Sequence, residues 1–295
     1  MNDCFSDVPG LRLGHAHDAR ARTGVTVIVP DAPVVMAVDV RGGGPGTRET
    51  DALDPANLVE RVHGLCLAGG SVFGLAAADE LALLLSAAGM GLEMGPDVPA
   101  VPVVPGAILF DLANGGNKAW GMTPPYRRLA AEAFGALGSD DRSGPVGAGH
   151  GARAGSRAGG IGSVSARMAS GHVIGAVIAA NSFGEVYAGA PPEGDVPMPK
   201  LDRLSSLSRQ STCIGAIATD APLTRAQARR IAMMAHDGLA RAIRPIHTPF
   251  DGDCLFVLST AADTGAGADP VMLTQIGTIA ADLVARAVRR AVGLD

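Results

Sequence analysis

One stretch of the sequence decides how the whole chain is interpreted: Ser211-Thr212-Cys213-Ile214-Gly215-Ala216-Ile217-Ala218-Thr219-Asp220-Ala221-Pro222-Leu223. Its small apolar residues, with Ile214 and Ile217 among them, predict a short buried strand. Two hydroxyl residues, Ser211 and Thr212, stand where this strand begins. Residues 190–210, which run into it, are polar and contain proline, which indicates an irregular linker.

Thr212 is the residue of this stretch that could carry chemistry. A threonine inside a chain is inert, but a broken Ser211–Thr212 bond would give it a free α-amine, with a pKa near ~8, beside its hydroxyl. The amine suits a general base and the hydroxyl a nucleophile, which is the pairing of N-terminal-nucleophile hydrolases. The alternative is a strand that simply begins with Ser-Thr, and this stretch alone leaves both interpretations open.

Composition places the chain among globular proteins with tightly packed small residues. Of 295 residues, 47% are hydrophobic, which excludes disorder and is enough for a sizeable core. Only 3% are aromatic and 40 are glycine, so the core is built from aliphatic residues with closely approaching backbones. The net charge of -5 comes without a basic stripe, so we expect no nucleic-acid partner.

The cysteines and the first residues indicate the cellular setting. Cys4, Cys66, Cys213 and Cys254 are scattered singly, without the spacing of zinc or redox motifs, and are interpreted as reduced core thiols. The start, MNDCFSDVPG, lacks the features of a signal peptide. No run reaches about eighteen uncharged apolar residues, so we expect no membrane partner and a cytoplasmic location.

Predicted strands and helices are interspersed along the chain. Short apolar runs rich in β-branched residues predict strands at residues 25–29, 34–40, 65–68, 173–180 and 254–260. Helical patterns cover residues 72–88 and 273–292, and the capping box Thr224-Arg225-Ala226-Gln227 begins another helix. We therefore expect one α/β domain, residues 1–295, with helices layered over sheets.

Glycines are unusually dense in residues 144–162. Such density either lets backbone amides face an anion or lets two strands lie very close, and the sequence does not decide between them. The turn Gly69-Gly70-Ser71 is a weak nucleotide-binding signal because no G-x-G-x-x-G or G-K-[ST] pattern is present.

Three polar residues outside the Thr212 stretch are candidates for a site. Asp251 and Asp253 flank Gly252 just before a predicted strand, where a carboxylate pair can bind a metal, orient an amine or form a turn. They follow the Thr212 strand by a helix and a loop, as hairpin-like pairing of adjacent strands would allow. Asn181 ends another strand and is either a turn residue or an amide donor to a developing oxyanion.

Six ordered segments together give the chain a family resemblance. They are residues 7–15 (DVPGLRLGH), 22–27 (RTGVTV), 46–51 (GTRETD), 68–79 (AGGSVFGLAAAD), 218–224 (ATDAPLT) and 251–253 (DGD). In these segments the chain resembles the L-aminopeptidase/D-esterase (DmpA-type) family, which includes β-peptidyl aminopeptidases and the nylon-oligomer endo-hydrolase. The resemblance covers nearly the whole chain.

This resemblance implies a fold and a processing event. The fold would be a layered αββα sandwich, two sheets between helical layers, of the type shared with ornithine acetyltransferase. The precursor would cut itself into an α-chain, residues 1–211, and a β-chain, residues 212–295. By register the family nucleophile falls on Thr212, so Ser211 would end the α-chain. The family's oxyanion-side asparagine maps onto Asn181, and its two aspartates map onto Asp251 and Asp253.

The same resemblance implies a peptide or amide substrate, no metal or organic cofactor, and a homo-oligomer, a tetramer or larger, of processed heterodimers. Three positions depart from the family pattern. Ser211 stands where Asn or Gly is common, Ser156 beside Arg157 replaces a lysine of some members, and Phe110 replaces a tyrosine. Ser156, Arg157 and Phe110 are candidates for the substrate or oxyanion side of the site.

Three functions therefore follow from the sequence. The first is a self-processing amide or peptide hydrolase, like an aminopeptidase, with Thr212 as nucleophile. The second is an endo-hydrolase of nylon-type 6-aminohexanoate oligomers, which would differ only in pocket shape. The third is an unprocessed, non-catalytic binding or assembly protein, which the three departures motivate. An acetyltransferase resembling the ornithine enzyme is disfavoured because the matched segments belong to the aminopeptidase branch.

Overall fold

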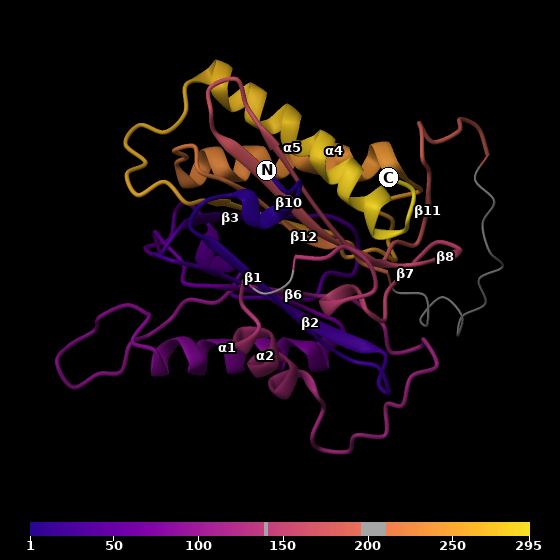
Figure 1. Cartoon of the computed structure of the whole chain (residues 1–295), viewed down its shortest axis with the longest axis horizontal. Coiled ribbons are helices and arrows are strands. Elements are labelled where there is room, and N and C mark those ends of the chain that lie inside the picture. The colour runs from indigo at the N-terminus through magenta and orange to yellow at the C-terminus, as the bar shows by residue number, and fades with distance from the viewer. Residues whose placement is uncertain (139–140, 196–210) are drawn as a thin grey trace.

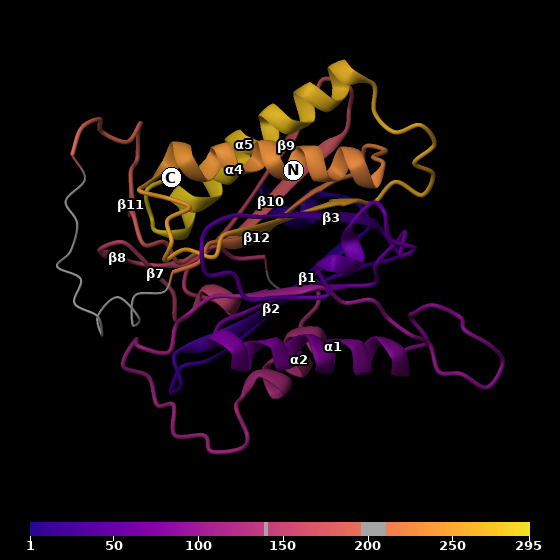
Figure 2. The same ribbon diagram turned by 180° about the vertical axis from the view of Figure 1, so that it is seen from behind.

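A computed structural model describes residues 1–138, 141–195 and 211–295, and in it two stacked sheets lie between two helical layers (Figure 1). Helices α4 (Arg225–Ala242) and α5 (Pro270–Ala291) form one outer layer, and α1 (Ala76–Ala87) and α2 (Tyr126–Gly135) form the other. The view from behind shows the same order of layers (Figure 2). The predicted αββα sandwich is therefore confirmed. Most of the predicted linker, residues 196–210, lies outside the described residues.

The sheet under α4 and α5 carries the Thr212 stretch. Its strand order is β3 (Val35–Val40), β14 (Cys254–Ser259), β12 (Ile214–Thr219), β10 (Val173–Ala180) and β9 (Gly160–Arg167). All residues of β10, β12 and β14 are buried, as expected for strands covered on both faces. β12 and β14 pair in parallel, so the hairpin-like pairing expected from sequence is wrong. The reason is α4, which carries the chain back to the starting edge before β14 begins.

The second sheet faces the first across a shared core. It has the order β1 (Leu11–Asp18), β2 (Thr23–Pro30), β5 (Leu65–Ala68), β6 (Gly106–Ile108) and β4 (Thr47–Arg48). The turn after β2 takes the chain from this sheet to β3 in the other one, so the two predicted strands at residues 25–40 do not pair. Leu13, Ile28 and Leu67 from this sheet meet Val177, Ile214 and Phe256 from the other in one buried cluster.

Two short antiparallel strand pairs lie outside the two main sheets. β7 (Arg153–Ala154) pairs with β8 (Arg157–Ala158), and β11 (Glu185–Val186) pairs with β13 (Ile243–Arg244). The main-chain N–H of Gly155, between β7 and β8, donates to the carbonyl of Ser182 over 3.0 Å. The β7–β8 pair is thereby fixed to the segment that leaves β10.

The helices follow their sequence signals with one difference. The predicted capping box is confirmed: Thr224 Oγ1 accepts from the N–H of Gln227, and the Gln227 side chain accepts from the N–H of Thr224. The helix expected over residues 72–88 instead begins as a 3-10 turn, Ser71–Leu75, before α1. Gly70 and Ser71, just before the expected start, both have positive φ angles, which an α-helix does not accommodate, so no helix extends further back than residue 71.

α5 is long and apolar enough, with a mean hydropathy of 1.4 over eighteen residues, to meet the length and composition of a membrane span. Half of that window is buried inside the protein. Ile276, Ala280, Val284 and Val288 on its inner face belong to the core cluster shared with β10 and α4. The hydrophobicity of α5 is therefore accounted for by packing on the sheet.

The glycine-dense segment lies where backbones come close. A Cβ on Gly162, in β9, would collide with the carbonyl of Ala287 in α5, and a Cβ on Gly151 would collide with the carbonyl of Arg22. Close approach of main chains is thus the interpretation that fits residues 144–162.

Candidate active site

Thr212 lies just before β12, and its side chain is 4% exposed. Its main-chain N–H donates to the carbonyl of Asn181 over 2.6 Å, because β10 and β12 are neighbours and Asn181 immediately follows β10. The Thr212 hydroxyl donates to the carbonyl oxygen of Ser211, also over 2.6 Å. Hydrogen bonds thus fix the Thr212 hydroxyl beside the Ser211–Thr212 peptide bond and also hold the nitrogen of that bond.

The Ser211 carbonyl has a second donor. The main-chain N–H of Gly252 donates to the same oxygen over 3.0 Å, and the N–H of Ser211 donates to the carbonyl of Phe250. These bonds continue the parallel β12–β14 pairing, with Ser211 bridged to Asp251. Donors to a carbonyl oxygen withdraw electron density from its carbon, and the Gly252 N–H, which remains when the Thr212 hydroxyl reacts, would stabilise negative charge on the oxygen.

Asp253 is completely buried beside Thr212. Its Oδ1 accepts from the N–H of Cys213 over 2.8 Å, and its Oδ2 lies 2.7 Å from Nδ1 of His247. One carboxylate therefore joins the residue after Thr212 to a histidine of the loop that precedes β14.

Asp251 is also completely buried and is held by different donors. Oδ1 accepts from the N–H of Phe183, and Oδ2 accepts from both the N–H and the hydroxyl of Thr248, at 2.9 and 2.6 Å. Burial, and then the neighbouring charge of Asp253, raise the pKa of Asp251 above its ordinary value. These hydrogen bonds act against that rise because they favour the charged form.

Asn181 is 3% exposed, and its amide orientation is set by two contacts. Its Oδ1 accepts from the N–H of Arg153 over 2.9 Å. Its Nδ2 donates one hydrogen to the carbonyl of Phe110 over 3.2 Å. These two contacts assign the oxygen and the nitrogen of the amide. An amide nitrogen carries two hydrogens. Asn181 thus has an oriented side-chain amide, and its main-chain carbonyl accepts from Thr212.

The remaining predicted site residues surround this centre less closely. Phe110 contributes its main-chain carbonyl to Asn181. Ser156 donates its hydroxyl to Glu185 over 2.8 Å, and Arg157 lies exposed on β8. The structure therefore brings together Ser211, Thr212, Asn181, Asp251 and Asp253. Phe110 and the β7–β8 pair contact this group through the side chain of Asn181.

Cys213 is the one thiol next to Thr212. Its side chain is completely buried, and burial together with the Asp253 charge raises the pKa of the thiol well above its ordinary value. A protonated buried thiol is a poor nucleophile. The hydroxyl of Thr212 is accordingly the better candidate.

Two residues with direct contacts to the aspartates were not identified from sequence. His247 and Thr248 bind Asp253 and Asp251 from the same short loop, residues 247–253, here called the aspartate loop. The signal that could have found them is their spacing, since a His-Thr pair three residues before Asp-Gly-Asp can fold back onto both carboxylates within one turn.

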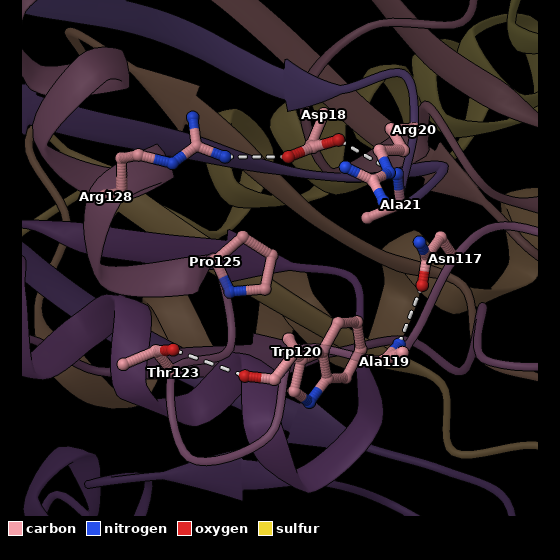
Figure 3. Close-up of a pocket in the computed structure, with 9 residues that line it drawn as sticks. All are labelled: Asp18, Arg20, Ala21, Asn117, Ala119, Trp120, Thr123, Pro125 and Arg128. Atoms are coloured by element: carbon pink, nitrogen blue, oxygen red, sulfur yellow. Dashed lines mark hydrogen bonds and ion pairs between the residues drawn. The ribbon is translucent and has the colours of Figure 1, made fainter.

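A cavity of about 260 Å³ lies apart from these residues, at the tip of the β1–β2 hairpin and the start of α2 (Figure 3). It is lined by Asp18, Arg20, Ala21, Asn117, Ala119, Trp120, Thr123, Pro125 and Arg128. Arg128 and Asp18 form an ion pair of 2.7 Å across it. None of the predicted site residues lines this cavity.

The chain is similar to several known proteins. Residues 3–293 match the sequence profile of peptidase family S58. An uncharacterized aminopeptidase of Mycobacterium tuberculosis is 42% identical over 96% of this chain and 92% of its own. A 6-aminohexanoate-oligomer endohydrolase of Agromyces is 28% identical over 97% of this chain and 84% of its own.

Solved structures share the fold. A β-aminopeptidase of Burkholderia superposes with a TM-score of 0.76 at 23% identity, covering 99% of this chain and 86% of its own. The L-aminopeptidase D-Ala-esterase/amidase of Ochrobactrum anthropi, described as a variant of the Ntn hydrolase fold, gives the same TM-score at 21% identity over the same shares.

Proposed function

The chain belongs to peptidase family S58 and is a peptidase of the aminopeptidase type, and we propose that Thr212 becomes its nucleophile by self-cleavage after Ser211. One observation carries the proposal: the Thr212 hydroxyl lies 2.6 Å from the oxygen of the Ser211 carbonyl, whose bond to Thr212 is the one to be cut. The substrates are peptides or related amides.

In the cleavage step Thr212 Oγ1 attacks the carbonyl carbon of Ser211 and loses its proton. The N–H of Gly252 donates to the oxygen that becomes negative. The C–N bond then breaks, and the proton that Oγ1 lost passes to the Thr212 nitrogen, which becomes a free amine, while Ser211 is left joined to Thr212 Oγ1 as an ester. Water hydrolyses this ester, which frees the Ser211 carboxylate and the Thr212 hydroxyl.

In the turnover step the free Thr212 amine takes the proton of its own hydroxyl as Oγ1 attacks a substrate carbonyl. Asn181 Nδ2 and a main-chain N–H hold the resulting oxyanion. The ammonium group donates its proton to the leaving amine, and water hydrolyses the acyl-enzyme ester. Asp251 and Asp253 hold the ammonium form, since both carboxylates are completely buried beside Thr212: Asp251 is bridged to Ser211, and Asp253 accepts from the N–H of Cys213.

A second activity, endo-hydrolysis of 6-aminohexanoate oligomers, is favoured by the Agromyces relative, which matches nearly the whole chain. The same nucleophile would serve both activities.

We further propose a homo-oligomer of processed heterodimers, because Val72, Phe73 and Leu83 expose large apolar side chains around α1. Light scattering tests this, and a mass near 29.7 kDa with full activity would contradict it.

A substrate panel separates the activities and the non-catalytic alternative. Purified protein is assayed with aminoacyl p-nitroanilides and with 6-aminohexanoate oligomers, each also with Thr212→Ala protein. We expect p-nitroanilide hydrolysis that the variant lacks. Oligomer hydrolysis alone would favour the endo-hydrolase, and no Thr212-dependent hydrolysis of either kind would favour a binding protein.

A further inference from the structure

Two histidines lie next to each other beside Asp253: His236 is buried, and the side chain of His247 is 20% exposed. His247 comes from the aspartate loop and His236 from α4, and their ring centroids are 4.9 Å apart with the rings at 70°. His247 contacts Oδ2 of Asp253, whereas Oδ1 of the same carboxylate accepts from Cys213. The two oxygens of Asp253 thus connect the histidine pair to the start of β12.

Hydrogen-bond complementarity fixes where the histidines carry their protons. A carboxylate only accepts, so Nδ1 of His247 donates to Asp253. A carbonyl also only accepts, so Nε2 of His236 donates to the main-chain oxygen of Asp39 over 3.1 Å. Burial lowers the pKa of His236 to about 4, which keeps that ring neutral near pH 7. Within the described residues, His247 Nε2 and His236 Nδ1 are buried without a hydrogen-bond partner.

The backbone of His247 is in a conformation that a histidine rarely adopts. Its φ is +56°, in the left-handed region that favours glycine and asparagine. Such a conformation persists only where the surrounding contacts impose it, and it is concentrated at functional sites. Here it lets His247 reach Asp253 while the next residue, Thr248, reaches Asp251.

We propose that His247 is a positioning residue, which fixes the Asp253 carboxylate so that its other oxygen holds Cys213 and, through it, Thr212. This inference rests on the proposed role of Thr212. His247 touches neither the hydroxyl nor the bond to be cut, so it acts through Asp253. Neutral His236 packs against its ring and keeps it aimed at the carboxylate.

Two substitutions separate this role from mere space filling. His247→Gly and His247→Asn both tolerate the positive φ, but only asparagine supplies an N–H close to the place of Nδ1. For His247→Gly we expect kcat to fall about 30-fold, as for loss of a hydrogen bond to a charged group, with KM within about twofold. For His247→Asn we expect kcat within about threefold of the unsubstituted protein. The rate of self-cleavage should also fall more in His247→Gly than in His247→Asn.

His172→Ala is the matched control, because His172 also faces an aspartate, Asp220, at the far end of the same strands. Its kcat should stay within about twofold of the unsubstituted value. Wild-type kcat in His247→Gly, or equal losses in His247→Gly and His247→Asn, would overturn the positioning role. If Thr212→Ala keeps its activity, the proposed function itself is wrong, whatever His247 does.

If His247→Gly fails to fold, NMR of the unsubstituted protein labelled with ¹⁵N-histidine decides. We expect a slowly exchanging Nδ1–H signal that disappears in His247→Asn. The absence of such a signal from the unsubstituted protein would overturn the proposal.

Discussion

Two histidine–aspartate pairs lie near opposite ends of β12 and differ in burial. At the far end of β10 and β12, His172 Nδ1 lies 3.4 Å from Asp220, and the two side chains are 30% and 28% exposed. At the Thr212 end, His247 lies 2.7 Å from Asp253, which is completely buried. A solvated pair contributes little, whereas a buried carboxylate must be held by donors on all sides. The difference supports the proposal that the chemistry takes place at the Thr212 end.

The largest effect expected from this contrast is at Thr212. Thr212→Ala removes the proposed nucleophile of both cleavage and turnover, so the chain should stay intact and hydrolysis should fall by more than ~1000-fold. Denaturing electrophoresis and p-nitroanilide assays measure both. Thr212→Ser keeps a hydroxyl and should retain cleavage, and Cys213→Ala should keep most activity. The reverse order would move the nucleophile to Cys213.

The second-largest effect on kcat is expected at Asn181. Asn181→Ala removes a side-chain donor to the proposed oxyanion, and loss of one such donor typically lowers kcat by about 100-fold. Steady-state kinetics of protein that has completed cleavage isolates this effect from processing. An unchanged kcat would show that Asn181 only supports Phe110 and Arg153.

The aspartates should have a smaller effect and a pH signature. Asp251→Asn and Asp253→Asn should each lower kcat more than about tenfold, since a hydrogen bond to a buried charge is lost. Because Asp253 helps to raise the pKa of Asp251, Asp253→Asn removes one cause of that rise. The residual activity should then persist to lower pH, so the acid limb of kcat/KM moves down. If the acid limb of the kcat/KM profile does not move, the ionisation of Asp251 does not control activity.

The smallest effect is expected at the far end. Asp220→Asn changes a partly exposed pair, and we expect kcat within about twofold and stability within about 1 kcal/mol. Thermal unfolding followed by circular dichroism, with the same activity assay, measures both. A large loss of activity in Asp220→Asn would show that the His172–Asp220 pair also matters for catalysis, and the contrast with the His247–Asp253 pair would be wrong.

Much of this arrangement could be predicted from sequence because its signals are local. The capping box at Thr224, the strand after Thr212 and the αββα layers were all predicted correctly. The parallel pairing of β12 and β14 was not, because register and direction depend on where α4 packs. His247 was missed for a related reason, since its contact with Asp253 requires a left-handed backbone that the sequence pattern does not display.

In the proposed self-cleavage, Thr212 itself cuts the bond between Ser211 and Thr212. Intact-mass spectrometry of the purified protein, joined to N-terminal sequencing, tests it most directly. We predict two fragments of 211 and 84 residues, the smaller one beginning Thr-Cys-Ile-Gly, and a single uncut chain for Thr212→Ala. A persistent 29.7 kDa chain that hydrolyses amides would contradict the claim.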